Sequence, residues 1–447
     1  MKNMLLFLFA FLCVASPTQA ATYSVAKTGK DTNPGTATAP WLTIQKAANV
    51  MAPGDTVLVS AGTYAERVLV SRSGTAGFPV TFQAQGLVAM KGFRILANYI
   101  HVDGFDISFT TPGWSSGPGV YVKGKTVEVS NNAMHDLPFY GIFYDAVPED
   151  SPDTSDGYIH GNVIIRAVEA GMRIMGTNHL IEANDISHSR EFQPGVTKYV
   201  SGDDADGIRF FGNGHVFRHN YIHDIYSTDP GNLTRPASKA PHIDALQTWG
   251  PAYNILFEAN YFSIPEDGMQ GSMISLQYAP VRDLTFINNI FVNGSAGYGP
   301  GLNFYSGSGH IMNVLIANND FIRPNGVGTY CIRLQPGIQT VTVQNNIAYN
   351  CGRSGYPYIA VEQPVPSIVI GYNDVYRTDG IPPPGSPYPN DLWMVDPNFV
   401  GMTDYHLQLN SPLIDAGIAV SGVSVDYDSV PRPQGAAYDI GAFEFFQ

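Results

Sequence analysis

The stretches VFRHNYIH (residues 216–223) and LFEANYFS (residues 256–263) decide the fold, because each places one asparagine between two short runs of strand-forming residues. The pattern recurs along most of the chain, with its asparagine at Asn132, Asn162, Asn184, Asn220, Asn260, Asn289, Asn319, Asn346 and Asn373. One turn earlier, Gly104 is expected to take the equivalent position. Successive members lie 22 to 40 residues apart. A repeat of this length is typical of a solenoid, in which each turn of the chain stacks on the one before.

The repeated asparagines are interpreted as a column of corners. Asparagine and glycine tolerate the left-handed backbone conformation that a sharp bend between two strands requires. Asparagine side-chain amides can also hydrogen-bond to the equivalent residues in the coils above and below. The sequence therefore predicts a ladder of stacked asparagines along one edge of the solenoid.

A second column lies earlier in each repeat, where a small residue opens a short strand, as in GMRIM at Gly171 and GLNFY at Gly301. Three strands per repeat with no helix between them predict an all-β fold, a right-handed parallel β-helix of about ten coils. A leucine-rich horseshoe is the alternative solenoid, but its leucine spacing is absent.

The ends of the chain depart from the repeat. Residues 1–20 read as a bacterial-type export signal, with Lys2 before an apolar run and a small residue, Ala20, at the expected cleavage site. Residues 21–64 are expected to form an N-terminal cap with a short helix that starts after Thr43. Residues 65–380 would form the β-helix, and the proline-rich start of residues 381–447 indicates a C-terminal capping segment packed over the last coil.

The export signal predicts a secreted or periplasmic protein. No later stretch is apolar enough to insert in a membrane, and the formal net charge of −14 disfavours nucleic acid as a partner. After cleavage two cysteines remain, Cys331 and Cys351, which form either a disulfide or two buried thiols. The sequence leaves the oligomeric state open.

The segment YSVAKTGKDTNPGTATAPWLTIQKAANVMAPGDTVLVSAGTYAERV (residues 23–68) resembles the opening of secreted right-handed parallel β-helix proteins, which include pectate, alginate and chondroitin lyases. DPNFV (residues 396–400), DYHLQLNSPLIDAG (residues 404–417) and PRPQGAAYDIGAFEF (residues 431–445) resemble the closing segment of many of these proteins. The resemblance implies a polysaccharide partner. It does not settle the reaction, because this scaffold carries lyases, hydrolases, epimerases and binding proteins.

The two longest gaps between ladder asparagines, 36 and 40 residues, are adjacent, so their extra residues should form neighbouring loops at about 188–203 and 226–241. Both loops lead into polar strands. Aligning these strands on Gly212 and Gly250 pairs Asp204 with His242, Asp206 with Asp244 and Arg209 with Gln247, and brings Arg173 beside Arg209.

This patch suits β-elimination on a uronic-acid polymer. Clustered carboxylates bind a hard cation such as Ca²⁺ or hold a proton between them, and the predicted metal ligands are Asp203, Asp204, Asp206 and Asp244. The predicted catalytic residues are His242, Asp244, Arg209, Asp206 and Arg173, with an arginine neutralising the uronate and His242, Lys198 or Lys239 as the base. The predicted substrate-binding residues are Gln247, Trp249, Lys198 and Lys239.

Two other functions remain open. Paired aspartates could hydrolyse a glycosidic bond, although the asparagine-aspartate and arginine-lysine motifs of the polygalacturonases are missing. The chain could also be a non-catalytic glycan-binding or cell-surface structural protein. Strict alternation would point Asp206 and Asp244 into the core beside Ile208 and Leu246, and only a bend at the strand entrance would expose them.

Overall fold

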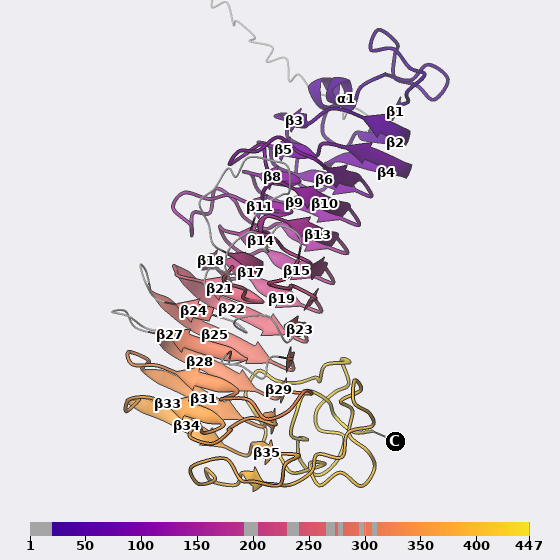
Figure 1. Ribbon diagram of the computed structural model, residues 1–447. Helices are drawn as coiled ribbons and strands as arrows, with labels where there is room; N and C mark the ends of the chain where they lie inside the picture. Colours follow the sequence, from indigo (N-terminus) through magenta and orange to yellow (C-terminus); the bar gives the residue numbers. More distant parts are fainter. Residues whose placement is uncertain are drawn as a thin grey trace, which may run out of the picture.

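The chain winds into a stack of coils, shown in Figure 1 from the indigo N-terminal end to the orange C-terminal coils. The structure is a computed structural model and describes residues 20–191, 204–229, 241–264, 273–275, 280–294, 299, 301–305 and 311–446. All pairings between its named strands are parallel, and the strands stack in three rows along the coils. The predicted parallel β-helix is thus confirmed.

The first row is an eleven-stranded parallel sheet, which carries the polar strands singled out above. Its strands are β3 (Val68–Val70), β5 (Phe93–Ile95), β8 (Val120–Val122), β11 (Ile142–Tyr144), β14 (Glu169–Ile174), β17 (Ala205–Phe210), β21 (Leu246–Thr248), β24 (Met273–Ser275), β27 (Leu302–Tyr305), β30 (Ile332–Leu334) and β33 (Ile359–Val361).

The other two rows belong to one 25-stranded sheet, because the long strand β4 pairs with both of them. The second row contains β1 (Thr22–Val25), β2 (Thr56–Tyr64), β4 (Val80–Met90), β6 (Ile100–Asp103), β9 (Val127–Ser130), β12 (Tyr158–His160), β15 (Leu180–Glu182), β18 (Gly212–Asn213), β19 (Val216–Arg218), β22 (Ala252–Glu258), β25 (Val281–Ile287), β28 (Ile311–Ala317), β31 (Thr340–Gln344) and β34 (Ser367–Gly371). The third row contains β7 (Asp106–Ser108), β10 (Ala133–Leu137), β13 (Val163–Ala167), β16 (Asp185–Ser187), β20 (Tyr221–His223), β23 (Tyr261–Ile264), β26 (Ile290–Asn293), β29 (Asp320–Ile322), β32 (Ile347–Tyr349), β35 (Asp374–Tyr376) and β36 (Leu392–Trp393).

The asparagine ladder lies between the second and third rows, as predicted. Asn220 donates from Nδ2 to Oδ1 of Asn260 at 2.9 Å, and Asn184 donates in the same way to Asn220 at 2.9 Å. The ladder residues are buried, and the last, Asn373, donates to Asp391. Their amides therefore replace the hydrogen bonds that the backbone lacks at each corner.

The left-handed residue at each corner is not the ladder asparagine but the residue before it. His219 has φ of 52° and Ala259 has φ of 52°, and Gly104 takes this position with φ of 84°. Phe105 rather than Gly104 therefore occupies the ladder position in its coil, where its N–H donates to Asn132. The prediction assigned both the left-handed bend and the ladder side chain to the asparagine, whereas the bend belongs to the residue before it.

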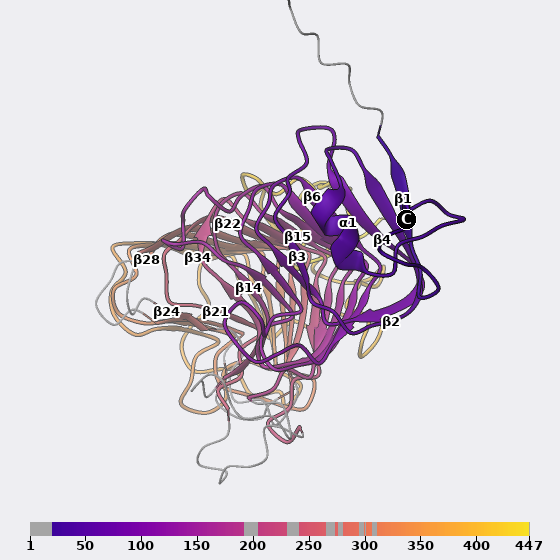
Figure 2. The same cartoon turned by 90° about the horizontal axis from the view of Figure 1, so that it is seen from above.

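The N-terminal end is covered by α1 (Ile44–Val50), which lies across the first coil when the stack is viewed from above (Figure 2). Thr43 is its N-cap, and its side chain accepts a hydrogen bond from the N–H of Lys46, as the sequence predicts. Ile44 and Ala47 join the main hydrophobic core. The helix thus buries apolar residues that an open coil would expose.

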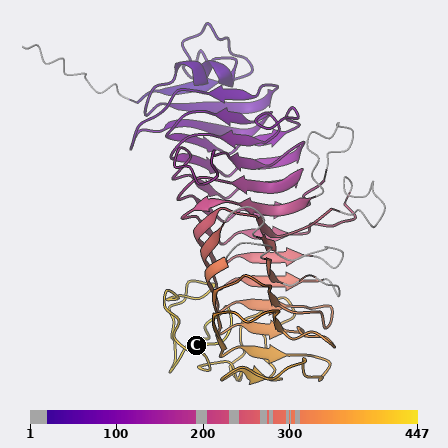
Figure 3. The ribbon, with the colours of Figure 1, turned by 90° about the vertical axis from the view of Figure 1, so that its left-hand side faces the viewer.

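The C-terminal segment covers the side of several coils rather than only the last one (Figure 3). The side chains of Asn288, Asn318 and Asn345 donate to backbone carbonyls of Val425, Asp439 and Ile418. These three asparagines are the left-handed corner residues, so their side chains point away from the ladder. Cys331 and Cys351 form a disulfide with Cα atoms 5.5 Å apart.

Candidate functional site

The predicted alignment of the polar strands is the one the structure shows. Asp204 forms a parallel bridge with His242, and Arg209 pairs with Gln247 across β17 and β21. Arg173 of β14 pairs with Arg209. The long connections that precede β17 and β21 therefore place this cluster at the entrance of neighbouring strands of the eleven-stranded sheet.

Arg209 is the buried centre of the cluster, with 4% of its side chain exposed. Its guanidinium contacts Oδ2 of Asp204 at 2.5 Å, Oδ2 of Asp206 at 2.8 Å and Oε2 of Glu169 at 3.0 Å. Three carboxylates around one guanidinium leave it little capacity to receive a fourth from a substrate. Arg209 therefore organises the acidic residues and is not accessible to a polymer.

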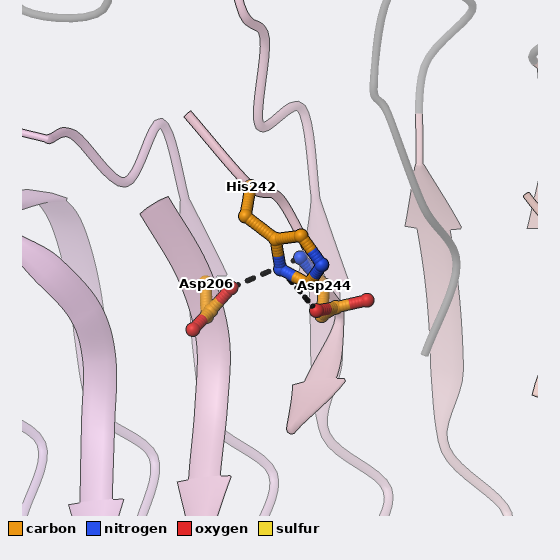
Figure 4. Close-up of side chains that lie close together, drawn as sticks. All are labelled: Asp206, His242 and Asp244. Carbon is orange, nitrogen blue, oxygen red and sulfur yellow. Dashed lines mark hydrogen bonds and ion pairs between the residues drawn. The ribbon is translucent and has the colours of Figure 1, made fainter. Parts of the chain in front are cut away.

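His242 is held by Asp244, as Figure 4 shows. Its Nδ1 lies 2.8 Å from Oδ2 of Asp244 and 4.0 Å from Oδ1 of Asp204. The amide nitrogen of Gln247 lies 3.4 Å from the same carboxylate oxygen of Asp244. Its Nε2 contacts none of the described residues, and 24% of the side chain is exposed. This arrangement orients one ring nitrogen and leaves the other without a hydrogen-bond partner among the described residues.

The charges of the cluster shift its ionisation. Burial disfavours the charged imidazolium, but the carboxylates of Asp244, Asp206 and Asp204 outweigh it and raise the pKa of His242 to about 9. Burial raises the pKa of Asp244, although the contact with His242 opposes that shift. Burial likewise raises the pKa of Asp206, against the lowering by Arg209.

Asp206 and Asp244 are fully buried, as strict strand alternation would have it. Asp206 accepts from the backbone N–H of Asp244 at 3.0 Å, which ties the two strand entrances together. Asp204 and His242, each about one quarter exposed, are the partly accessible groups of this cluster. The two buried aspartates thus position other groups and are not exposed to a polymer.

Arg173 lies beside this cluster in an aromatic environment. Its guanidinium is 4.8 Å from the ring centre of Phe211, 5.5 Å from Trp114, 5.6 Å from Trp249 and 5.8 Å from Phe143. Trp249, predicted to bind substrate, packs edge-on against Phe211 with ring centres 4.7 Å apart. Trp249 thus belongs to an aromatic cluster adjacent to the acidic one.

A metal ion could bind to the buried group formed by Asp206, His242 and Asp244, whose ligand atoms lie within 4.8 Å of one another. Oδ1 of Asp244 is buried and has no hydrogen-bond partner among the described residues, which fits a role as a cation ligand. Two carboxylates and an imidazole form a mixed oxygen and nitrogen donor set, so the group itself does not select one ion.

Three predicted residues, Asp203, Lys198 and Lys239, lie outside the described residues. Sequence reasoning missed Glu169, which enters the cluster from the start of β14, and Tyr140, whose hydroxyl lies 3.3 Å from both Arg173 and Arg209. Each stands one or two residues before the small residue that opens its strand. Their position shortly before that small residue was the signal that could have identified them.

Comparison with known proteins agrees with the fold and leaves the activity open. Residues 27–85 match the family described as protein of unknown function DUF1565. The uncharacterized protein YwoF of Bacillus subtilis (strain 168) is 42% identical over 59 residues, a match that spans 13% of either chain. The match therefore covers only a small part of that relative.

Solved structures with this architecture are similar along most of the chain. A structure of XylC in complex with xylose has a TM-score of 0.53 at 13% identity and covers 95% of this chain and 98% of its own. The structure of pectate lyase Pel9A has a TM-score of 0.48 at 15% identity, and the match covers 96% of this chain and 97% of Pel9A. At 13% identity the match to XylC shows the fold alone.

The one helix within the described ranges, α1, has seven residues, and no helix there is long and apolar enough to cross a membrane.

Proposed function

We propose that this chain is a secreted or periplasmic polysaccharide lyase that cleaves a uronic-acid-containing polymer by β-elimination. The observation that carries the proposal is the pair formed by His242 and Asp244. One ring nitrogen is fixed by a buried carboxylate at 2.8 Å, the other has no hydrogen-bond partner among the described residues, and about a quarter of the side chain is exposed. Such a pair suits proton transfer to or from a bound polymer.

In the proposed reaction, neutral His242 accepts through Nε2 the proton on the carbon next to the uronate carboxylate. The electrons of that C–H bond form a carbon–carbon double bond, and the glycosidic oxygen leaves with its bonding pair and takes a proton from the imidazolium or from water. Asp244 holds the tautomer with the proton on Nδ1 and stabilises the imidazolium. Asp206 holds the starts of the two neighbouring strands together, and Arg209 positions the carboxylate of Asp204.

A bound Ca²⁺ would neutralise the uronate carboxylate and thereby acidify the neighbouring C–H. Among the described residues, the oxygens of Asp204 and Asp206 and the unpartnered Oδ1 of Asp244 would hold it. Oδ2 of Asp244 would remain on His242, so one aspartate would serve the cation and the imidazole together.

The test is a digest of alginate, pectate and chondroitin, with and without a chelator, followed by the ultraviolet absorbance of the unsaturated uronate. The wild type should generate this absorbance on at least one polymer, and His242→Ala should not. Equal absorbance from the His242→Ala variant would refute the assignment of the base.

Glycoside hydrolysis is the second candidate, because burial raises the pKa of both Asp206 and Asp244 and so favours a shared proton. In that case reducing ends would appear without the absorbance. The full burial of both aspartates ranks this candidate below elimination, since neither can reach a sugar without a rearrangement.

A further inference from the structure

Arg173 differs from the other arginine of the site in what surrounds it. Arg209 is buried against three carboxylates, whereas Arg173 is half-buried and forms no ion pair among the described residues. Its recorded polar contacts are to neutral atoms, the hydroxyl of Tyr140 at 3.3 Å and the sulfur of Met175 at 3.5 Å. Its positive charge is therefore not balanced by any described side chain.

The aromatic rings around Arg173 fix the guanidinium without neutralising it. A cation over an aromatic face is attracted to the ring, and the charge remains available to an anion. Phe211 and Phe143 are fully buried beneath it, while Trp114 is 41% exposed and Trp249 is half-buried. The guanidinium is thus backed by fixed rings and flanked by two accessible indoles.

A chain of contacts separates Arg173 from the proton-transfer group. The hydroxyl of Tyr140 lies 3.3 Å from a nitrogen of each arginine, Arg209 contacts Asp204 at 2.5 Å, and Asp204 lies 4.0 Å from Nδ1 of His242. Three side chains therefore stand between Arg173 and His242. Arg173 makes no hydrogen bond or ion pair with His242 among the described residues, which favours separate sugar residues for the carboxylate on Arg173 and for the proton that is removed.

We infer that Arg173 binds the carboxylate of a uronate next to the reacting one, with Trp114 and Trp249 against the sugar ring. The inference rests on the proposed function, because it takes a uronate polymer as the ligand. It gives Arg173 a binding role in place of the catalytic role expected from the sequence. It also predicts a preference for polymers that carry carboxylates on consecutive residues.

The protein is acidic overall, with a formal net charge of −14, so a polyanion gains nothing from its general field. A bidentate, charge-assisted hydrogen bond between the guanidinium of Arg173 and a carboxylate would attract the polymer locally. Glutamine at position 173 would keep polar contacts but lose both the charge and the planar fork. Lysine would keep the charge and lose only the fork.

The experiment is titration calorimetry in a His242→Ala background, which prevents turnover. The probes are tetrasaccharides of galacturonate, mannuronate and guluronate, each beside its carboxyl-reduced neutral form. Arg173→Gln and Arg173→Lys are compared with Arg333→Gln, which removes an arginine from the same column of the sheet, where it is ion-paired with Glu362. Unchanged far-ultraviolet spectra confirm that each variant is folded.

The expected result is that at least one acidic tetrasaccharide binds about tenfold or more tighter than its neutral form. Arg173→Gln should abolish that preference, Arg173→Lys should retain part of it, and Arg333→Gln should retain all of it. A preference that survives Arg173→Gln, or no preference for any of the three acidic probes, would overturn the inference. If the preference depends on Arg173 while the wild type yields no unsaturated product, the proposed reaction fails and the subsite stands.

Discussion

Replacing Arg209 with methionine should be among the most destabilising single changes in the eleven-stranded sheet. The side chain is 4% exposed and balances Glu169, Asp204 and Asp206. Methionine fills a similar volume but leaves three carboxylates with no cation among them. Breaking a buried ion pair by removing one partner costs about 3–5 kcal/mol, so we expect a loss of unfolding free energy of that size.

The loss should depend on pH. Burial already raises the pKa of Asp206, and Arg209 opposes this shift, so removing Arg209 raises that pKa further. An acid whose pKa is raised on folding favours the folded state while it is protonated, and this stability is lost as the pH rises through the folded-state pKa. Arg209→Met should therefore be closer to the wild type in mild acid and furthest from it at neutral and alkaline pH.

Urea unfolding followed by circular dichroism at several pH values measures both effects. Arg333→Met is the matched control, because Arg333 lies in the same column and pairs with Glu362 while both remain about one third exposed. Such a partly exposed pair contributes below about 1 kcal/mol. An equal, pH-independent effect of the two substitutions would refute the reasoning about Arg209.

Three further predictions concern the base, the ladder and the cation. The kcat/KM of the wild type should rise with pH toward a plateau above the pKa of His242, about 9. Asp244→Asn should move this rise to lower pH, because it removes a carboxylate that raises the pKa of His242, and an unmoved profile would contradict the assigned base. Asn220→Ala should cost about 2–4 kcal/mol in urea unfolding, because Asn220 donates to Ile181 and Asn260 and accepts twice from Asn184. Asn410→Ala, at an exposed residue without a left-handed backbone, should cost little, and similar losses would contradict the ladder's role. Adding Ca²⁺ to chelator-treated protein should raise the Tm of the wild type and not that of Asp244→Asn, and no shift in the wild type would argue against a Ca²⁺ site.

The fold could be predicted from the sequence because one residue type recurs at one structural position. Each buried amide bonds to the next coil, so asparagine recurs in successive turns, as the bond of Asn220 to Asn260 illustrates. The backbone bend was assigned one residue too late, because the left-handed residue varies in type, from His219 to Ala259. The C-terminal segment packs along the side of the coils through asparagines such as Asn288 and Asn318. In the sequence these residues cannot be distinguished from the ladder asparagines that follow them directly.

The pairing of the site strands could also be predicted, because parallel register follows from aligning their closing glycines. The accessibility of each side chain could not. The sequence predicted that Arg209 could contact a uronate. In the structure, Glu169 from the preceding coil joins Asp204 and Asp206 around its guanidinium. The contrast between Arg209 and Arg173 arises from neighbours that are distant in sequence.

The most direct measurement is mass spectrometry of the products formed in water enriched in heavy oxygen. Elimination breaks the glycosidic bond without adding water, so the account predicts that neither new chain end carries the label at the cleaved linkage and that one end is unsaturated. Incorporation of one heavy oxygen per cleavage, with no unsaturated end, would show that the site hydrolyses its polymer and would contradict the proposed chemistry.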